Sequence, residues 1–210
     1  MSDVRAASRR IVRHLALAAL FAVGTLVLYA IVRDAPPLQR LSIATAYAGL
    51  GFLAASLLVG PFNERRGRPN PVSTNLRRDI GIWAAIGGVA HTVFGLQVHM
   101  RGEITRYFIP DGGLAISKST LAFLTANYTG LAATLILAVL LAISNDVAVG
   151  TLGTTRWKRV QRWNSLLFAL VAVHGALYLT VDKASWILVV PFILVVALVA
   201  QVRIPRFLSR

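Results

Sequence analysis

The 210-residue sequence contains no cysteine. Secreted scaffolds stapled by disulfides are therefore excluded, because they depend on cysteine pairs. Iron–sulfur clusters, thiolate-ligated haem, covalently attached c-type haem and zinc–thiolate sites are excluded as well. Histidine is left as the strong iron ligand, and the chain has four histidines.

Charged residues are also scarce. They make up 14% of the chain, against about 25% in an ordinary soluble domain. Hydrophobic residues make up 56%, and the mean hydropathy is +0.67. So much apolar material excludes a disordered chain. The composition predicts an integral membrane protein, whose first partner is the lipid bilayer.

Acidic residues are the scarcer of the two charges, with 8 against 22 basic residues and a net charge of +14. In a soluble protein this excess would indicate nucleic-acid binding. Here the basic residues lie between apolar runs, where the positive-inside rule and anionic lipid headgroups account for them. We therefore expect no nucleic-acid partner.

Six apolar segments are separated by short polar loops. Each is close to the ~20 residues that a helix needs to cross ~30 Å of hydrocarbon, and Leu- and Ala-rich runs of this length favour helices over barrel strands. The first run is long enough to span and has no clear cleavage site, so we expect a spanning helix rather than a cleaved signal. The prediction is an all-α polytopic membrane protein, a six-transmembrane-helix bundle that forms a single transmembrane domain over residues 1–210. The expected helices cover about residues 15–32, 41–61, 80–100, 119–144, 160–180 and 184–202.

The distribution of basic residues predicts the orientation of this bundle. Sixteen of the 22 fall in the two termini and the second and fourth loops, and six fall in the other three loops. The positive-inside rule then places both termini in the cytoplasm, an N-in/C-in arrangement. The longest loop, about residues 101–118, faces outward and contains a Pro-Asp-Gly-Gly turn signal.

Ionisable residues within the expected spans are few, and such residues are functional candidates because they are costly in a bilayer. All eight acids fall in loops or at helix edges, and no Lys or Arg lies deep in a span. Three histidines remain inside, His91, His99 and His174, whereas His14 sits among arginines and is expected to be interfacial. Ion-coupled transporters usually need buried carboxylates or broken helices. Neutral imidazoles between apolar walls instead suit a membrane haem protein.

The depth of each histidine favours one pair. At ~1.5 Å per residue, His91 lies roughly 16 Å and His174 roughly 21 Å from the basic side, whereas His99 lies roughly 28 Å away. The 5 Å mismatch is within ordinary helix tilt. We predict that His91 and His174 approach each other, with His99 as the poorer match. The alternative for each histidine is a hydrogen bond to a neighbouring helix.

Small residues recur on the helical face of His91. Ala84, Gly88 and Gly95 share that face, and Gly87 lies beside it. One interpretation is that they leave room for a flat ligand such as a porphyrin. The other is close helix–helix packing of the small-xxx-small kind. The spacing alone fits both.

Two motifs resemble a known family. Residues 77–83 read Arg-Arg-Asp-Ile-Gly-Ile-Trp and are followed eight residues later by His91. Residues 141–144 read Leu-Ala-Ile-Ser, and residues 156–161 read Arg-Trp-Lys-Arg-Val-Gln, with His174 thirteen residues further on. In this order, over about residues 45–180, the chain resembles the ferric-reductase-like transmembrane family. Within that family it is most similar to the haem-binding membrane subunits of bacterial periplasmic methionine sulfoxide reductase systems.

The resemblance implies b-type haem held by two histidines and electron transfer across the bacterial inner membrane, and it maps His91 and His174 onto the haem and iron ligands. The chain departs from the family at Gln161, where the family has a histidine. We therefore expect one haem b rather than two. Electrons would come from a cytoplasmic flavin or quinol donor, such as a flavin reductase, and leave to a periplasmic acceptor such as a reductase subunit. The alternative is a haem-free membrane scaffold or small-solute carrier with the same fold.

Overall fold

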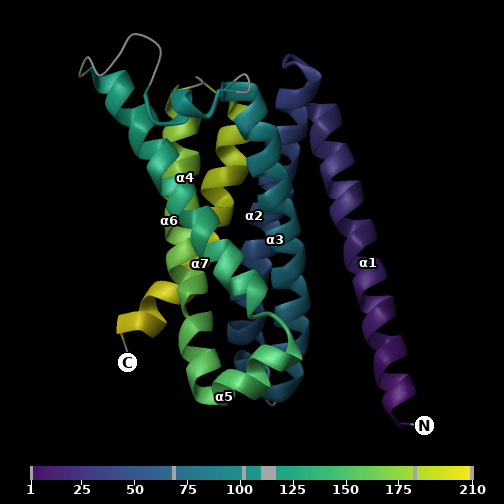
Figure 1. Cartoon of the computed structure of the whole chain (residues 1–210). Coiled ribbons are helices and arrows are strands. Elements are labelled where there is room, and N and C mark those ends of the chain that lie inside the picture. Colours follow the sequence, from purple (N-terminus) through teal and green to yellow (C-terminus); the bar gives the residue numbers. More distant parts are fainter. Residues whose placement is uncertain (1, 68–69, 101–102, 110–116, 182–183, 209–210) are drawn as a thin grey trace.

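The computed structural model describes residues 2–67, 70–100, 103–109, 117–181 and 184–208. In these residues every regular element is a helix (Figure 1). Six segments are long and apolar enough to cross a membrane, which confirms the all-helical class and the six expected spans. The helices are α1 (Ser2–Ile31), α2 (Pro37–Arg65), α3 (Asn70–Met100), α4 (Lys118–Ala142), α5 (Asp146–Gln161), α6 (Trp163–Val181) and α7 (Trp186–Leu208), with a short 3-10 helix, η1 (Ile104–Tyr107), before α4.

Several boundaries differ from the sequence prediction. Helix α1 begins at Ser2 rather than near residue 15, and α3 begins at Asn70 rather than near residue 80. The polar, Arg-rich ends extend these helices beyond the hydrocarbon-length apolar runs, which hydropathy alone does not detect. The larger error is the fourth loop, because residues 146–161 form α5. The Asn145 side chain caps this helix by accepting a hydrogen bond from the Ala148 amide at 2.7 Å.

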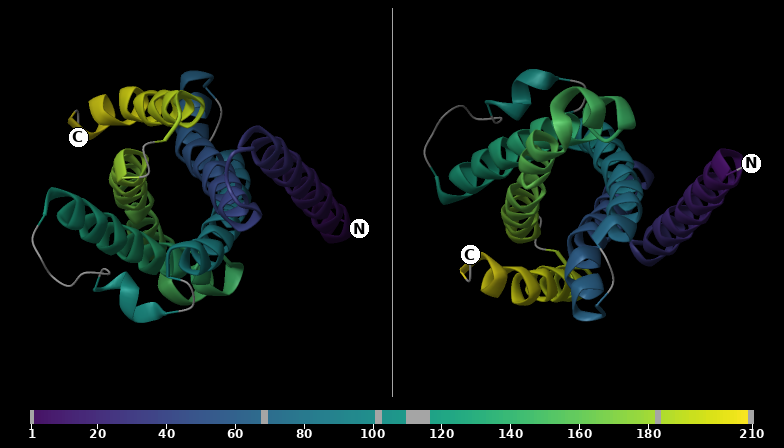
Figure 2. Two further views of the ribbon diagram at one scale, coloured as in Figure 1. Left: turned by 90° about the horizontal axis from the view of Figure 1, so that it is seen from above. Right: turned by 90° about the horizontal axis from the view of Figure 1, so that it is seen from below.

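Five helices, α2, α3, α4, α6 and α7, form a ring when the molecule is seen along its long axis (Figure 2). Helix α1 lies outside the ring, against α2 and α3. Helix α5 lies across one end of the bundle, and both the start of α1 and the end of α7 lie toward that end (Figure 1). The two termini therefore share one side of the bundle, as the orientation prediction requires.

Helix α2 has the most buried of the six described spans. About 61% of its apolar span is buried, against none of the span of α1. A Cβ atom added to Gly87 of α3 would lie 2.9 Å from the Cα atom of Gly49 on α2, so the two backbones touch at this point. Gly87 thus serves close helix packing, the second of the two interpretations of the small-residue stripe.

A buried ionic cluster holds α1 against α3. The Asp79 side chain is fully buried and accepts a hydrogen bond from Nε of Arg13 at 2.6 Å, with Arg10 at 3.4 Å. Nε2 of His14 lies 3.3 Å from the same carboxylate, and its Nδ1 accepts a hydrogen bond from Trp83. The expectation that every acid lies in a loop or at a helix edge is therefore wrong for Asp79, because α3 begins nine residues before it. His14 is part of this cluster, and its expected position at the membrane interface stays a prediction.

Candidate functional site

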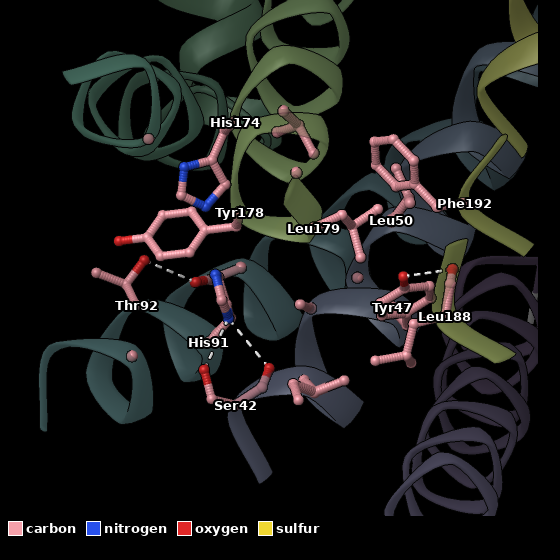
Figure 3. Close-up of a pocket in the computed structure, with 18 of the residues that line it drawn as sticks. Ser42, Tyr47, Leu50, His91, Thr92, His174, Tyr178, Leu179, Leu188 and Phe192 are labelled. Atoms are coloured by element: carbon pink, nitrogen blue, oxygen red, sulfur yellow. Dashed lines mark hydrogen bonds between the residues drawn. The ribbon is translucent and has the colours of Figure 1, made fainter. Parts of the chain in front are cut away.

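A cavity of about 530 Å³ lies inside the ring of helices. Its walls come from all five ring helices, and they are mainly apolar. Both His91 and His174 line it, from α3 and α6 respectively (Figure 3). The volume falls within the ~300–1,000 Å³ typical of cofactor and ligand sites.

The His91 ring is oriented by α2. Its Nδ1 lies 3.0 Å from the backbone oxygen of Ser42 and 3.2 Å from the Ser42 hydroxyl. A carbonyl oxygen can only accept, so Nδ1 carries the hydrogen and Nε2 of the neutral ring carries the lone pair. Gly95, one turn further along α3, borders the ring, and a Cβ there would make an ordinary van der Waals contact with His91 Cε1 at 3.9 Å.

The His174 ring is oriented in the same way by α4. Its Nδ1 lies 2.8 Å from the backbone oxygen of Ala126, which again assigns the hydrogen to Nδ1 and the lone pair to Nε2. Gly130 makes this approach feasible, because a Cβ there would lie 2.7 Å from Nδ1 and 2.8 Å from Cε1. Sequence analysis singled out neither Ser42, Ala126 nor Gly130, since each acts through contacts between distant segments.

The two imidazoles face each other across the cavity. Their ring centroids are 6.0 Å apart and their planes are inclined by 73°. Figure 3 shows the Nε2 edge of each ring directed toward the other histidine. At metal–nitrogen distances of ~2.0 Å, two imidazole nitrogens on opposite sides of one metal ion would lie about 4 Å apart, and the ring radii bring the centroids to roughly 6 Å. The observed separation therefore fits a single iron held between His91 and His174, the pair that helical depth predicts.

A buried polar network adjoins His174. The Tyr178 ring lies 4.9 Å from the His174 ring, centroid to centroid, and its hydroxyl donates to Oδ1 of Asn127 at 2.6 Å. The Asn127 amide donates to the backbone oxygen of Tyr107 at 2.9 Å, and the Tyr107 hydroxyl donates to the backbone oxygen of Asn127. Sequence analysis missed these three residues, because they come from η1, α4 and α6.

Glycines on the cavity wall receive side chains from facing helices. A Cβ on Gly88 would lie 2.6 Å from Cδ2 of Leu137 on α4, and one on Gly175 would lie 2.6 Å from the Phe192 ring on α7. All four residues line the cavity. The wall is thus made of small positions paired with long apolar side chains. Such side chains can change rotamer to fit a flat ligand.

The other residues considered from the sequence lie elsewhere. Gln161 ends α5 and is not among the residues that line the cavity, and its Nε2 atom is buried without a hydrogen-bond partner. The His99 side chain lies outside the described residues, so its prediction as the poorer match stays untested. Among the described residues, no three or more His, Asp or Glu side chains form a group that could hold a metal ion.

Comparison with known proteins leaves the family open. No family model matches the chain, and no curated protein matches it. The ferric-reductase-like family therefore stays a prediction from the two motifs, and the function is argued from the site alone.

Proposed function

We propose that the protein is a membrane electron-transfer subunit that holds one b-type haem between His91 and His174. The observation that carries the proposal is the opposed pair of imidazoles, whose ring centroids are 6.0 Å apart. Each ring has its Nδ1–H bonded to a backbone carbonyl. Metal-binding histidines have this second bond as a rule, because it sets the tautomer and the ring orientation. A porphyrin supplies four nitrogen ligands, so two histidines complete the coordination of its iron.

When bound, the haem would supply one-electron redox chemistry. The chain's own residues would bind the haem, orient its ligands and surround it. Ser42 and the Ala126 carbonyl direct the two Nε2 atoms into the cavity. Leu137 and Phe192 contribute to the apolar part of the cavity wall. Apolar groups around a bound iron would raise the cost of charge on it and so tune its potential.

The direction of transfer follows from the basic residues. The α5 end of the bundle carries the two Arg-rich termini and the Arg-rich α2–α3 connection, so we assign it to the cytoplasm of a bacterial inner membrane. Electrons would enter there from a cytoplasmic flavin or quinol donor. They would leave at the η1 end to a periplasmic acceptor such as a reductase subunit. A single haem is proposed, since Gln161 offers an amide where a second site would need an imidazole.

The deciding experiment is a haem assay on the purified protein in detergent, after expression with haem supplied. We expect one haem per chain and a low-spin spectrum in both redox states. His91→Ala and His174→Ala should each abolish the low-spin spectrum. His14→Ala should preserve it, because His14 contacts Asp79 and Trp83 and does not line the cavity. Absence of a Soret band from the wild-type protein would refute the proposal, and two haems per chain would refute the argument from Gln161.

A haem-free carrier or scaffold is the second candidate, and one observation favours it. The cavity extends from the histidines to the outer connections, where Arg33, Gln39 and Ser185 line it. A small apolar solute could occupy such a space. The same assay separates the two functions, because a carrier would show no Soret band and no dependence on His91.

A further inference from the structure

Asn127 is a polar side chain whose amide oxygen and amide nitrogen both have hydrogen-bond partners. It is fully buried on α4. Its carbonyl oxygen accepts from Tyr178, its amide nitrogen donates to the backbone of Tyr107, and its own backbone oxygen accepts from the Tyr107 hydroxyl. A buried amide with unmet hydrogen-bonding capacity would cost ~1–3 kcal/mol, so these bonds strongly favour one position of the side chain.

The residue before Asn127 orients a candidate iron ligand. The backbone oxygen of Ala126 accepts the Nδ1–H bond of His174 at 2.8 Å. Any rotation or slide of this turn of α4 would move the carbonyls of both residues together, because they are consecutive in one helix. What holds Asn127 in place therefore also holds the acceptor that orients His174.

Tyr178 closes the arrangement from α6. It lies one helical turn after His174, and its ring lies against the imidazole at 4.9 Å. Its hydroxyl bond to Asn127 ties that turn of α6 to the same turn of α4. His174 is thus fixed by one direct bond to Ala126 and by one indirect link through Tyr178 and Asn127.

Tyr107 extends this link to the outer end of the molecule. It ends η1, and it holds Asn127 through both its hydroxyl and its backbone. Burial raises the pKa of the Tyr107 phenol above its usual 10.0, so the hydroxyl stays protonated and can donate at neutral pH. The η1 segment is therefore connected to His174 by an unbroken set of hydrogen bonds and one ring contact.

We propose that Asn127, held by Tyr107 and Tyr178, is a positioning residue that sets the orientation of His174 and couples it to the outer η1 segment. This inference rests on the proposed haem function and names which residues control one of its two ligands. Asn127 does not contact the iron. Its effect is on how well His174 stays bonded, which carbon monoxide reports, because it binds ferrous haem only where an axial ligand has left.

The test compares four variants of the purified haem protein: Asn127→Leu, Tyr107→Phe, Tyr178→Phe and Asn164→Leu. The last is the matched control, since Asn164 is also a buried amide. Its nitrogen donates to the Ser56 hydroxyl at 3.2 Å, and neither residue lines the cavity. The readouts are the fraction of reduced protein that binds carbon monoxide, the rate of haem transfer to a scavenger protein, and the unfolding temperature.

We expect Asn127→Leu to lose haem about tenfold faster than wild type and to gain carbon monoxide binding, as substitutions behind a metal ligand do. Each tyrosine variant should show a smaller change of the same kind, because each removes one hydroxyl and keeps its ring. Wild-type behaviour in all three variants would overturn the inference while leaving the haem function intact. So would equal changes in Asn164→Leu, which would trace the effect to general loosening of the bundle. A wild-type protein without haem would refute the proposed function itself, and this inference with it.

Discussion

Replacing Gly130 by alanine places a methyl group where the His174 ring lies. The added Cβ would be 2.7 Å from Nδ1 and 2.8 Å from Cε1, whereas ordinary contacts between such atoms are about 3.5–4.0 Å. The ring must therefore move by about 1 Å. A movement of this size away from α4 would lengthen the Nδ1 bond to Ala126, now 2.8 Å, beyond hydrogen-bond range.

The expected cost has two parts. Overpacking of this kind costs ~1–3 kcal/mol, and a lost hydrogen bond costs ~1 kcal/mol. The two costs are not additive, because the ring movement that relieves the overpacking is the one that breaks the hydrogen bond. We expect a haem affinity lower by about ten- to a hundredfold, the usual effect of disturbing the groups behind a metal ligand. Haem content and low-spin absorbance of Gly130→Ala measure this loss.

Gly51→Ala is the control, because a Cβ at Gly51 on α2 meets nothing within 4 Å. We expect it to keep full haem content and wild-type stability, or to gain a few tenths of a kcal/mol from the helix preference of alanine. If Gly130→Ala binds haem as Gly51→Ala does, the His174 ring does not depend on the gap at Gly130, and the orientation argument fails.

Three further predictions concern packing, the ionic cluster and topology. Gly87→Ala should lower the free energy of unfolding by ~1–3 kcal/mol, measured by thermal unfolding in detergent, because its Cβ would lie 2.9 Å from the Gly49 backbone. Asp79→Asn should lower the free energy of unfolding by ~1–3 kcal/mol and release α1 from α3. This cost is less than the ~3–5 kcal/mol of a fully buried pair, because Arg10 and Arg13 are about one-third exposed. Asp146, whose side chain is 75% exposed, provides the control, and Asp146→Asn should change the free energy of unfolding by less than ~1 kcal/mol. Cross-linking of engineered cysteines between α1 and α3 would report the release, and undiminished cross-linking would contradict it. Single cysteines replacing Gly67 and Thr105 should be labelled by an impermeant maleimide from the inside and the outside, respectively, and the reverse pattern would invert the orientation.

The spans and the histidine pair were predictable from the sequence because both depend on local, regular geometry. A helix rises 1.5 Å per residue, so counting from a loop places His91 and His174 at similar depth without knowledge of tertiary contacts. In the structure the centroids of the two imidazole rings are 6.0 Å apart. Helix α5 was missed because its Gly-, Thr- and Arg-rich segment lacks an apolar run, and its Gly153 adopts a positive φ of 71°.

The groups that orient the pair could not be predicted in the same way. Ser42 and Ala126 act through backbone oxygens, which every residue has, so no side-chain pattern marks them. Asn127 and Tyr107 are 20 residues apart and belong to different helices, so no local sequence pattern pairs them. Asp79 was assigned to a helix edge because hydropathy begins the span one residue later, whereas burial depends on α1 covering it.

The ionic cluster on α3 has a consequence for the first helix. Large apolar side chains of α1 are exposed on many sides, among them Leu15, Leu20, Val23 and Leu26. A helix that is apolar all round has little preference for one rotation about its axis in a bilayer. The Asp79 cluster restricts that freedom, because Arg10, Arg13 and His14 of α1 must all reach the same buried carboxylate. A single acidic residue thus sets how far α1 is inserted and which of its sides faces the rest of the protein.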